Sequence, residues 1–367
     1  MRTSKCSVSR MALPIMSALI AALGQDPASA SETVTYTYDA QGRLTGATHS
    51  GTVNNGIGAA YSHDQADNRS NVTVTGAPGS GCTPGTTNSY AIPAGTTSWT
   101  VPAGVNCVTV FAIGAGGNGE SRGATSGSAR GGGSGGFSKL NNYATTPGTL
   151  ISVQVAAAGS GAQTFWANNS TLLANAGTSG TSGAPGSGGA SGVGDVVYAG
   201  ASAGTATNNS GSGGAGAAGP DGAGRASGNT TNLGASGGGG ADGLSSTASP
   251  ACSSGSNGCN GGVGPSGTAG GLGAVGSTAA TAGSNGSGGG GGGPSNRTGR
   301  AGSQYGIWTI TAGPLAGSTA GPGSGGGGGN TSGASGATGG NAGGYGGGGG
   351  GSRTGGSGTN GIIVVVY

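Results

Sequence analysis

Glycine-dominated tracts constrain the fold of this chain more than any other feature of its sequence. Glycine supplies 96 of the 367 residues, and the densest tracts are Gly286–Gly293, Gly325–Gly329 and Gly346–Gly351. Ordering a glycine costs more backbone entropy than ordering any other residue, so such tracts either pack densely or stay disordered. Polyproline-II helices allow dense packing, because three residues per turn without side chains let segments hydrogen-bond to one another. We therefore expect a bundle of such helices, with a flexible linker as the alternative.

The rest of the composition argues against a conventional core. Charged residues make up 6% of the chain and aromatic residues 4%, whereas an ordinary domain carries about 25% charged residues. Disordered chains are usually charged, and this one is nearly neutral, which favours close packing. The scattered arginines form no basic patch, so we expect no nucleic-acid partner.

Residues 1–30 have the pattern of a cleaved signal peptide. Three basic residues precede an apolar run from Met11 to Gly24, and Ala28-Ser29-Ala30 is typical of a cleavage site. The run is too short for a permanent transmembrane helix, although an uncleaved anchor remains the alternative. We expect cleavage near Ala30, no transmembrane segment afterwards, and a secreted, extracellular or cell-surface protein. Loss of the leader lowers the net charge from +3 to about +1.

The expected mature chain has four cysteines: Cys82, Cys107, Cys252 and Cys259. An exported protein is free to oxidise them, and four cysteines allow three pairings. Proximity in the sequence favours Cys82 with Cys107 and Cys252 with Cys259. A metal site is the alternative, but the spacing lacks the paired C-x-x-C pattern of structural zinc, so no metal or other cofactor is expected.

Alternation of apolar and polar residues predicts an all-β framework. Strands are expected on both sides of a Val-Pro-Ala-Gly turn near 101–104, and again on both sides of Thr146-Pro147-Gly148. The strongest β run is Gly361–Tyr367, which would aggregate unless it paired inside a sheet. We expect it to pair beside the strand Cys107–Ile113, closing a domain of residues 95–367 that follows a linker over 77–94.

A short repeat fills residues 31–76. Two copies 25 residues apart each place an aspartate after an aromatic or imidazole residue and before a turn and an arginine, which predicts stacked β-hairpins. The segment resembles the YD repeats of RHS-type proteins. The residues that carry the resemblance are Tyr38, Asp39, Gly42 and Arg43 in the first copy and His63, Asp64, Asn68 and Arg69 in the second. Two copies are too few to build the enclosing shell of that family.

Residues 95–367 resemble the glycine-rich domain of bacterial exported proteins and phage tail-fibre adhesins. The resemblance rests on the segment from Trp99 to Gly117, the lead-in Gly131–Phe137, the Thr146-Pro147-Gly148 turn and the terminal strand. It implies polyproline-II helices whose connecting loops contact a receptor. The candidate contact residues are Tyr198, Tyr305, Trp308 and Tyr345, and packing of these rings against the sheet is the alternative.

The expected mature chain carries few residues that could catalyse a reaction, so we expect no catalytic site. Its only histidines are His49 and His63, and its only lysine is Lys139, which excludes a phosphate-binding G-x-x-x-x-G-K-[ST] loop. The carboxylates after residue 76 lie far apart in sequence, whereas a glycosidase needs two at a defined separation. Asp195 and Asp242 lie in fragments similar to calcium nonapeptide repeats, with ordinary turns as the alternative.

These features predict a secreted, non-enzymatic structural and adhesive surface protein. Its partner would be a cell-surface or extracellular ligand, with a glycan as one candidate, and self-association is open. The alternatives are a phage-derived receptor-binding adhesin, an ice- or surface-binding protein and, least favoured, a secreted hydrolase.

Overall fold

The computed structural model describes residues 32–51, 58–75, 82–123, 127–231, 234–243, 245–252, 257–295, 297–332 and 336–367. The predicted signal peptide lies outside these ranges. The chain divides into two compact units, Met1–Gly81 and Cys82–Tyr367. The described residues contain strands and one short 3₁₀ turn but no α-helix, which confirms the all-β class. The described residues therefore contain no helix that is long and apolar enough to cross a membrane.

The first unit is a four-stranded antiparallel sheet in the order β1-β2-β3-β4. Each of the two sequence repeats forms one hairpin, and β2 pairs with β3 to join them. The strands are β1 (Glu32–Tyr38), β2 (Leu44–Gly51), β3 (Gly58–His63) and β4 (Arg69–Thr75).

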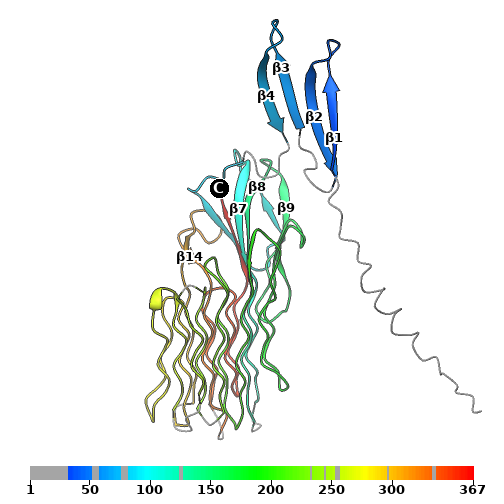
Figure 1. Cartoon of the computed structure of the whole chain (residues 1–367). Helices are drawn as coiled ribbons and strands as arrows, with labels where there is room; N and C mark the ends of the chain where they lie inside the picture. Colours follow the sequence, from blue (N-terminus) through cyan, green and yellow to red (C-terminus); the bar gives the residue numbers. More distant parts are fainter. Residues whose placement is uncertain are drawn as a thin grey trace, which may run out of the picture. The chain divides into compact units, whose positions relative to one another are not determined.

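The second unit has a β-framework at one end, from which long glycine-rich segments run side by side (Figure 1). A four-stranded sheet has the order β11-β10-β9-β6, a five-stranded sheet the order β12-β8-β7-β15-β5, and β13 pairs with β14. The strands are β5 (Ser89–Ile92), β6 (Ser98–Thr100), β7 (Cys107–Ile113), β8 (Phe137–Ala144), β9 (Leu150–Gln154), β10 (Thr164–Trp166), β11 (Leu172–Ala174), β12 (Val196–Tyr198), β13 (Trp308–Thr309), β14 (Thr319–Ala320) and β15 (Ile362–Val366).

The last strand lies inside the five-stranded sheet, as the sequence predicted. β15 is antiparallel to β7 on one side, with Val364 opposite Phe111, and to β5 on the other, with Val364 opposite Ala91. Both edges of the β15 backbone are therefore paired, which removes the aggregation risk of a bare apolar strand. The linker expected over 77–94 is too long, because β5 falls within it and belongs to the sheet.

Two apolar clusters fill the β-framework. One contains Trp99, Trp166 and Val110 among its buried residues, and the other contains Phe137, Ile310 and Val364. Val364 and Val365, which are adjacent in β15, belong to different clusters, so this strand presents one face to each. The few large side chains of the second unit are thus concentrated around the strand that joins its two ends.

The glycine-rich segments form helices with three residues per turn, which is the period of polyproline II. Three consecutive backbone N–H groups donate to three different neighbouring segments, and the next three return to the same neighbours, shifted by three residues. In the tract that begins at Gly325, these donors and acceptors are Gly325 to Gly239, Gly326 to Gly348, Gly327 to Arg300, Gly328 to Ser236, Gly329 to Gly351 and Asn330 to Arg297, over 2.8–3.1 Å. The tract is therefore an ordered part of a bundle.

The carbonyl groups of the same tract point to three further segments. The oxygens of residues 325, 326 and 327 accept from the N–H groups of Gly289, Gly214 and Gly340. The tract thus has six neighbours, all held through backbone atoms. A Cβ on Gly326 would come closer than 3.0 Å to the Gly340 carbonyl oxygen, which leaves no room for any side chain.

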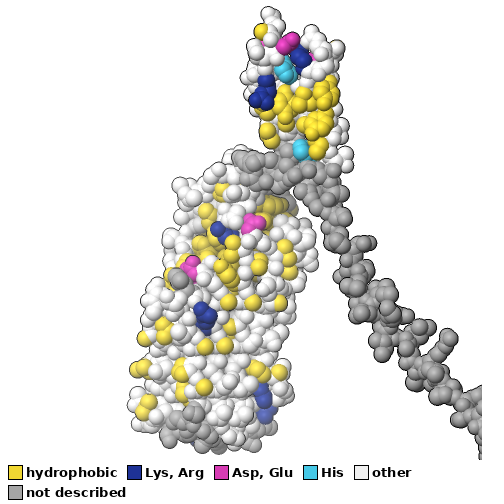
Figure 2. All heavy atoms as spheres, viewed as in Figure 1, with side chains coloured by type: hydrophobic (Ala, Val, Ile, Leu, Met, Phe, Trp, Pro, Cys, Tyr) yellow, Lys and Arg dark blue, Asp and Glu magenta, His cyan; other side chains and the backbone are white. Residues whose placement is uncertain are grey.

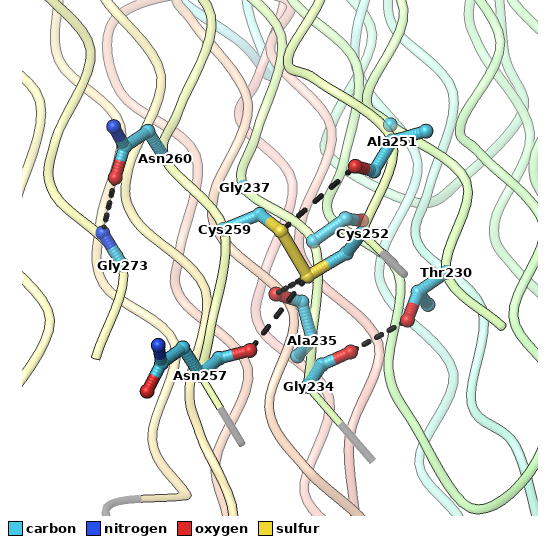
Figure 3. The surroundings of a disulfide bond; sticks show 12 residues. Thr230, Gly234, Ala235, Gly237, Ala251, Cys252, Asn257, Cys259, Asn260 and Gly273 are labelled. Carbon is cyan, nitrogen blue, oxygen red and sulfur yellow. Dashed lines mark hydrogen bonds between the residues drawn. A yellow bond between two sulfur atoms is a disulfide. The ribbon is translucent and has the colours of Figure 1, made fainter. Parts of the chain in front are cut away.

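Polar side chains replace missing backbone acceptors on the outer helices. The N–H of Gly273 donates to Asn260 Oδ1 over 2.9 Å (Figure 3), and the N–H of Leu272 donates to Thr281 Oγ1 over 2.7 Å. Gly204 and Gly228 use the serine hydroxyls of Ser227 and Ser249 in the same way. Buried N–H groups need a partner, so many serines, threonines and asparagines here stabilise the bundle itself.

Both predicted disulfides are present. Cys82 and Cys107 have Cα atoms 5.3 Å apart, and Cys252 and Cys259 have Cα atoms 5.6 Å apart. The second bond lies among the glycine helices, where Cys252 Sγ is 3.5 Å from the Ala235 carbonyl oxygen (Figure 3). Disulfides of this kind fit an oxidising compartment.

Candidate binding pocket

A pocket of about 320 Å³ opens beside β5 and β6 in the second unit. Its volume lies at the lower end of the range for small-ligand sites. The segments that form it are far apart in sequence, and they lie together because β15 brings the end of the chain back to β5. The lining residues are Tyr90, Ile92, Pro93, Thr96, Ser98, Trp99, Thr100, Pro102, Ala312, Pro314 and Tyr367.

Aromatic rings hold one another in place at this pocket. The Trp99 ring lies edge-on to Tyr90, with centroids 6.2 Å apart, and 6.1 Å from the ring of Tyr367. Behind it, Trp166 packs at 5.3 Å from Trp99 and is fully buried. Gly313 has a φ of +84° and packs against the Tyr90 ring, so a Cβ there would lie 2.5 Å from a ring carbon. The rings are therefore fixed before any ligand arrives.

Hydroxyl groups provide most of the hydrogen-bonding capacity of the lining side chains. Tyr90, Tyr367, Thr96, Ser98 and Thr100 carry them, and none of the described side chains that line the pocket is charged. Burial, and to a smaller extent the neighbouring Tyr90, raises the pKa of Tyr367 above its ordinary value of 10.0. The Tyr367 phenol therefore keeps its proton at neutral pH and can donate it to a ligand.

The four aromatic residues predicted as contacts are partly buried and do not project freely. Tyr198 in β12 stacks on Phe137 with centroids 6.2 Å apart, and Trp308 in β13 packs on Phe111 at 5.3 Å. Tyr345 packs against the second apolar cluster, and burial raises its pKa. Tyr305 is also partly buried. Packing against the framework, the alternative stated for these rings, therefore holds for at least three of them, and Tyr198 and Trp308 lie in strands rather than on loops. A contact role for their exposed parts stays a prediction.

The first YD-like turn is organised around Asp39. Its Oδ1 accepts the N–H groups of Gln41 and Arg43, each over 2.9 Å, and its Oδ2 accepts Arg43 Nε over 2.7 Å. These bonds with Arg43 hold the pKa of Asp39 below its ordinary value of 3.8. Gly42 adopts a φ of +78°, which a glycine tolerates without strain.

The second turn repeats this geometry with different residues. Asp64 Oδ1 accepts the N–H groups of Ala66 and Asn68, and the Asn68 amide donates to Asp64 Oδ2 over 3.2 Å. Asn68 thus occupies the place of Arg43, whereas Arg69, which the sequence comparison aligned with Arg43, begins β4. The left-handed residue is Asp67, with a φ of +65°, rather than Asn68.

One face of the four-stranded sheet is apolar. Tyr36, Ala47, Ala59 and Val74 lie in register across its four strands. Tyr36 and Val74 are exposed in this structure, and hydrophobic side chains gather over this sheet in Figure 2. The second unit shows mostly backbone and uncharged polar side chains on the face drawn there, with hydrophobic side chains scattered among them.

Carboxylates of the glycine-rich unit accept hydrogen bonds inside the fold. Glu120 is buried, and its oxygens lie 3.2 Å from Arg122 Nη1 and 4.0 Å from Arg130 Nη1. Asp195 Oδ2 accepts the N–H of Asn141 over 2.6 Å, which links the residue before β12 to the middle of β8. Within the described ranges, no group of three His, Cys, Asp or Glu residues could hold a metal ion.

Asp242 is fully buried at a turn between glycine helices. Its Oδ1 accepts the N–H of Asp221 over 2.9 Å, while its buried Oδ2 has no hydrogen-bond partner. Burial raises the pKa of Asp242 from 3.8 to about 6, and the charge of Asp221 adds to this rise. The carboxyl is therefore destabilised in its ionised form at neutral pH.

Comparisons with known proteins found no relative: no protein-family model and no curated protein matches the chain.

The sequence analysis did not predict the pocket, although the residues that form it carry a weak signal. Pro93 and Pro102 mark turns after short strands, and Trp99 is one of three tryptophans. Their proximity to Tyr367 follows only from the pairing of β5 with β15.

Proposed function

We propose that this chain is a secreted, non-enzymatic protein of the cell surface or extracellular space, with a structural and adhesive role. In this proposal, the glycine bundle is a stiff support, and the aromatic pocket in its β-framework is the binding site. The observation that carries the proposal is the backbone hydrogen-bond network around tracts such as Gly325–Gly329, which bonds to six neighbouring segments, three through its N–H groups and three through its carbonyl groups. Such a network costs little side-chain entropy and yields a rigid body.

The chemistry of the described side chains supports binding rather than catalysis. Asp39 and Asp64 accept hydrogen bonds within their own turns, and buried Glu120 pairs with Arg122, which leaves these carboxylates poorly placed as general acids or bases. The pocket offers neutral rings and hydroxyls, which suit reversible binding of a neutral ligand. The two disulfides are consistent with an exported protein.

The experiment is adhesion by the purified, disulfide-bonded chain. Beads that carry the chain are expected to bind a panel of bacterial and eukaryotic cells above the level of albumin-coated beads. A double variant, Tyr90→Phe with Thr100→Val, removes pocket hydroxyls with little change of volume and is expected to reduce binding. Leu272→Ser, on an exposed position of an outer helix, is the matched control. Absence of binding to every surface tested would overturn the adhesive role.

Hydrogen exchange tests the structural role separately. Amides of residues 325–330 are expected to exchange at least about 10³-fold more slowly than in an unfolded chain, because they are buried and bonded. Exchange at the unfolded rate throughout this tract would replace the stiff bundle by a flexible linker.

A further inference from the structure

We propose that the aromatic pocket binds a short, extended peptide stretch that contains proline and adopts the polyproline-II conformation. This inference rests on the proposed adhesive function and names the ligand class of the same pocket. The observations behind it are the hydrogen-bonding groups of the lining, the placement of its rings and its lack of charge.

The hydrogen-bonding groups match a ligand that is rich in acceptors. The lining side chains offer hydroxyls, and none of the described lining side chains carries a carboxylate, a carboxamide or a cationic group. A proline residue has no N–H, so a proline-containing stretch presents mainly carbonyl acceptors. The Tyr367 and Tyr90 hydroxyls can donate to such carbonyls. The vicinal hydroxyls of a sugar are better matched by carboxylate and amide groups, which this lining lacks.

The rings form a suitable surface for pyrrolidine groups. Tyr90 and Tyr367 both pack against Trp99, with centroid distances of 6.2 and 6.1 Å, and Ile92 also lines the pocket. Trp99 is only 4% exposed, so the partly buried Tyr90 and Tyr367 supply most of the accessible ring surface. Aromatic-lined grooves of this kind bind polyproline-II segments because the ligand is already extended and loses little entropy.

The rim restricts the ligand to a short stretch. Pro93, Pro102 and Pro314 line the pocket, and their rings limit rearrangement of the segments that carry them. A volume of about 320 Å³ accommodates part of an extended chain and excludes a helix, whose diameter is about 10–12 Å. The expected ligand is therefore a proline-rich stretch on the surface of another protein.

The test is a titration of the full disulfide-bonded chain with fluorescein-labelled decaproline. A labelled decamer of alternating glycine and serine is the matched peptide, and a panel of neutral oligosaccharides forms a third arm. Decaproline is expected to bind about tenfold more tightly than the glycine-serine peptide. Affinity is expected to change less than about twofold between 50 and 500 mM salt, because no charges pair.

Variants locate the binding site. Tyr90→Phe with Tyr367→Phe keeps both rings and is expected to weaken decaproline binding about tenfold, since two hydrogen bonds are lost. Leu272→Ser is expected to leave it unchanged. Equal affinity for both peptides, or an unchanged affinity of the double phenylalanine variant, would overturn the proposal. Oligosaccharide binding that the same variant abolishes would assign the pocket to sugars and overturn it too. Cell adhesion by the unmodified chain without decaproline binding would refute the ligand class alone, whereas absence of adhesion by the unmodified chain would refute the proposed function.

Discussion

Arg43 and Asp67 join the two turns of the four-stranded sheet through an ion pair, with Arg43 Nη1 2.6 Å from Asp67 Oδ1. The same arginine also bonds to Asp39 Oδ2 within its own turn. The second turn carries Asn68 at the place of Arg43, so the described repeats make this cross-turn bond once.

These contacts predict unequal roles for the two aspartates. Asp39→Asn is expected to speed amide exchange of Gln41 and Arg43, because their N–H groups lose a charged acceptor. Asp67→Asn is expected to leave those two amides unchanged, because the Asp67 side chain is 72% exposed and exposed ion pairs contribute little. Amide exchange measured by NMR compares the two variants. Equal effects would contradict the central role of Asp39.

The lowered pKa of Asp39 adds a pH dependence to this turn. The folded carboxyl loses its proton more readily than the unfolded one, so its stabilising effect is present above pH 3.8 and is lost as the pH falls through the lowered folded value. Exchange of the Arg43 amide should therefore accelerate only below about pH 3.8. Acceleration already near pH 6 would point to a different group.

A single methyl group is expected to disrupt the glycine bundle. Gly326→Ala places a Cβ against the Gly340 carbonyl oxygen and should cost about 3 kcal/mol or more of unfolding free energy, since overpacking against backbone cannot relax through a rotamer. Gly183→Ala is the control, because nothing lies within 4 Å of a Cβ there. Denaturant unfolding measures both variants, and equal stability would refute the dense packing.

Asp242 is expected to make the bundle more stable in mild acid. Its folded pKa of about 6 exceeds the ordinary 3.8, so the folded state binds the proton more tightly. The free energy of unfolding should increase by about 3 kcal/mol as the pH falls from 7 to below 3.8. This contribution of Asp242 is lost again as the pH rises through the folded pKa of about 6.

Two variants test this assignment by urea unfolding at pH 4 and pH 7. The asparagine in Asp242→Asn cannot ionise, so this variant should lose most of the difference in unfolding free energy between pH 4 and pH 7. Asp221→Asn should retain most of it, because burial contributes more to the raised pKa than the charge of Asp221 does. A wild-type chain with equal stability at both pH values would contradict the prediction.

The two disulfides should differ in their effect on stability. Cys82 and Cys107 are 25 residues apart in sequence, whereas Cys252 and Cys259 are 7 apart. Loop-closure entropy gives about 3.5 kcal/mol for the longer loop and about 2.4 kcal/mol for the shorter. Paired Cys→Ala variants compared by chemical denaturation are expected to follow this order, and the reverse order would show that contacts in the folded state dominate.

The framework could be predicted from the sequence where side chains alternate. The terminal run Ile362–Val366 predicts a buried strand because it is apolar and β-branched, and its partner Cys107–Ile113 is also rich in apolar residues. β5 was missed because four residues ending before Pro93 give too short a pattern. Its position depends on pairing with β15, a contact between residues more than 270 positions apart.

The internal order of the bundle could be predicted only as a type of helix. Glycine has no side chain that could reveal a face, so the assignment of Gly325 to Gly239 and of Gly326 to Gly348 leaves no trace in the residue pattern. The pocket was missed for a related reason, because Tyr90, Pro314 and Tyr367 come from three distant segments. The two turn aspartates were found because their bonds are local.

The backbone-bonded bundle also determines how stability should vary with temperature. Exposing apolar surface to water on unfolding raises the heat capacity, while exposing polar peptide groups lowers it. A body such as 325–330 and its neighbours buries mainly peptide groups, so its heat-capacity change per residue should fall below the usual 12–15 cal/mol/K. Its stability curve would then be broad and shallow, and the folded state would persist well into the cold, where domains held by apolar cores weaken.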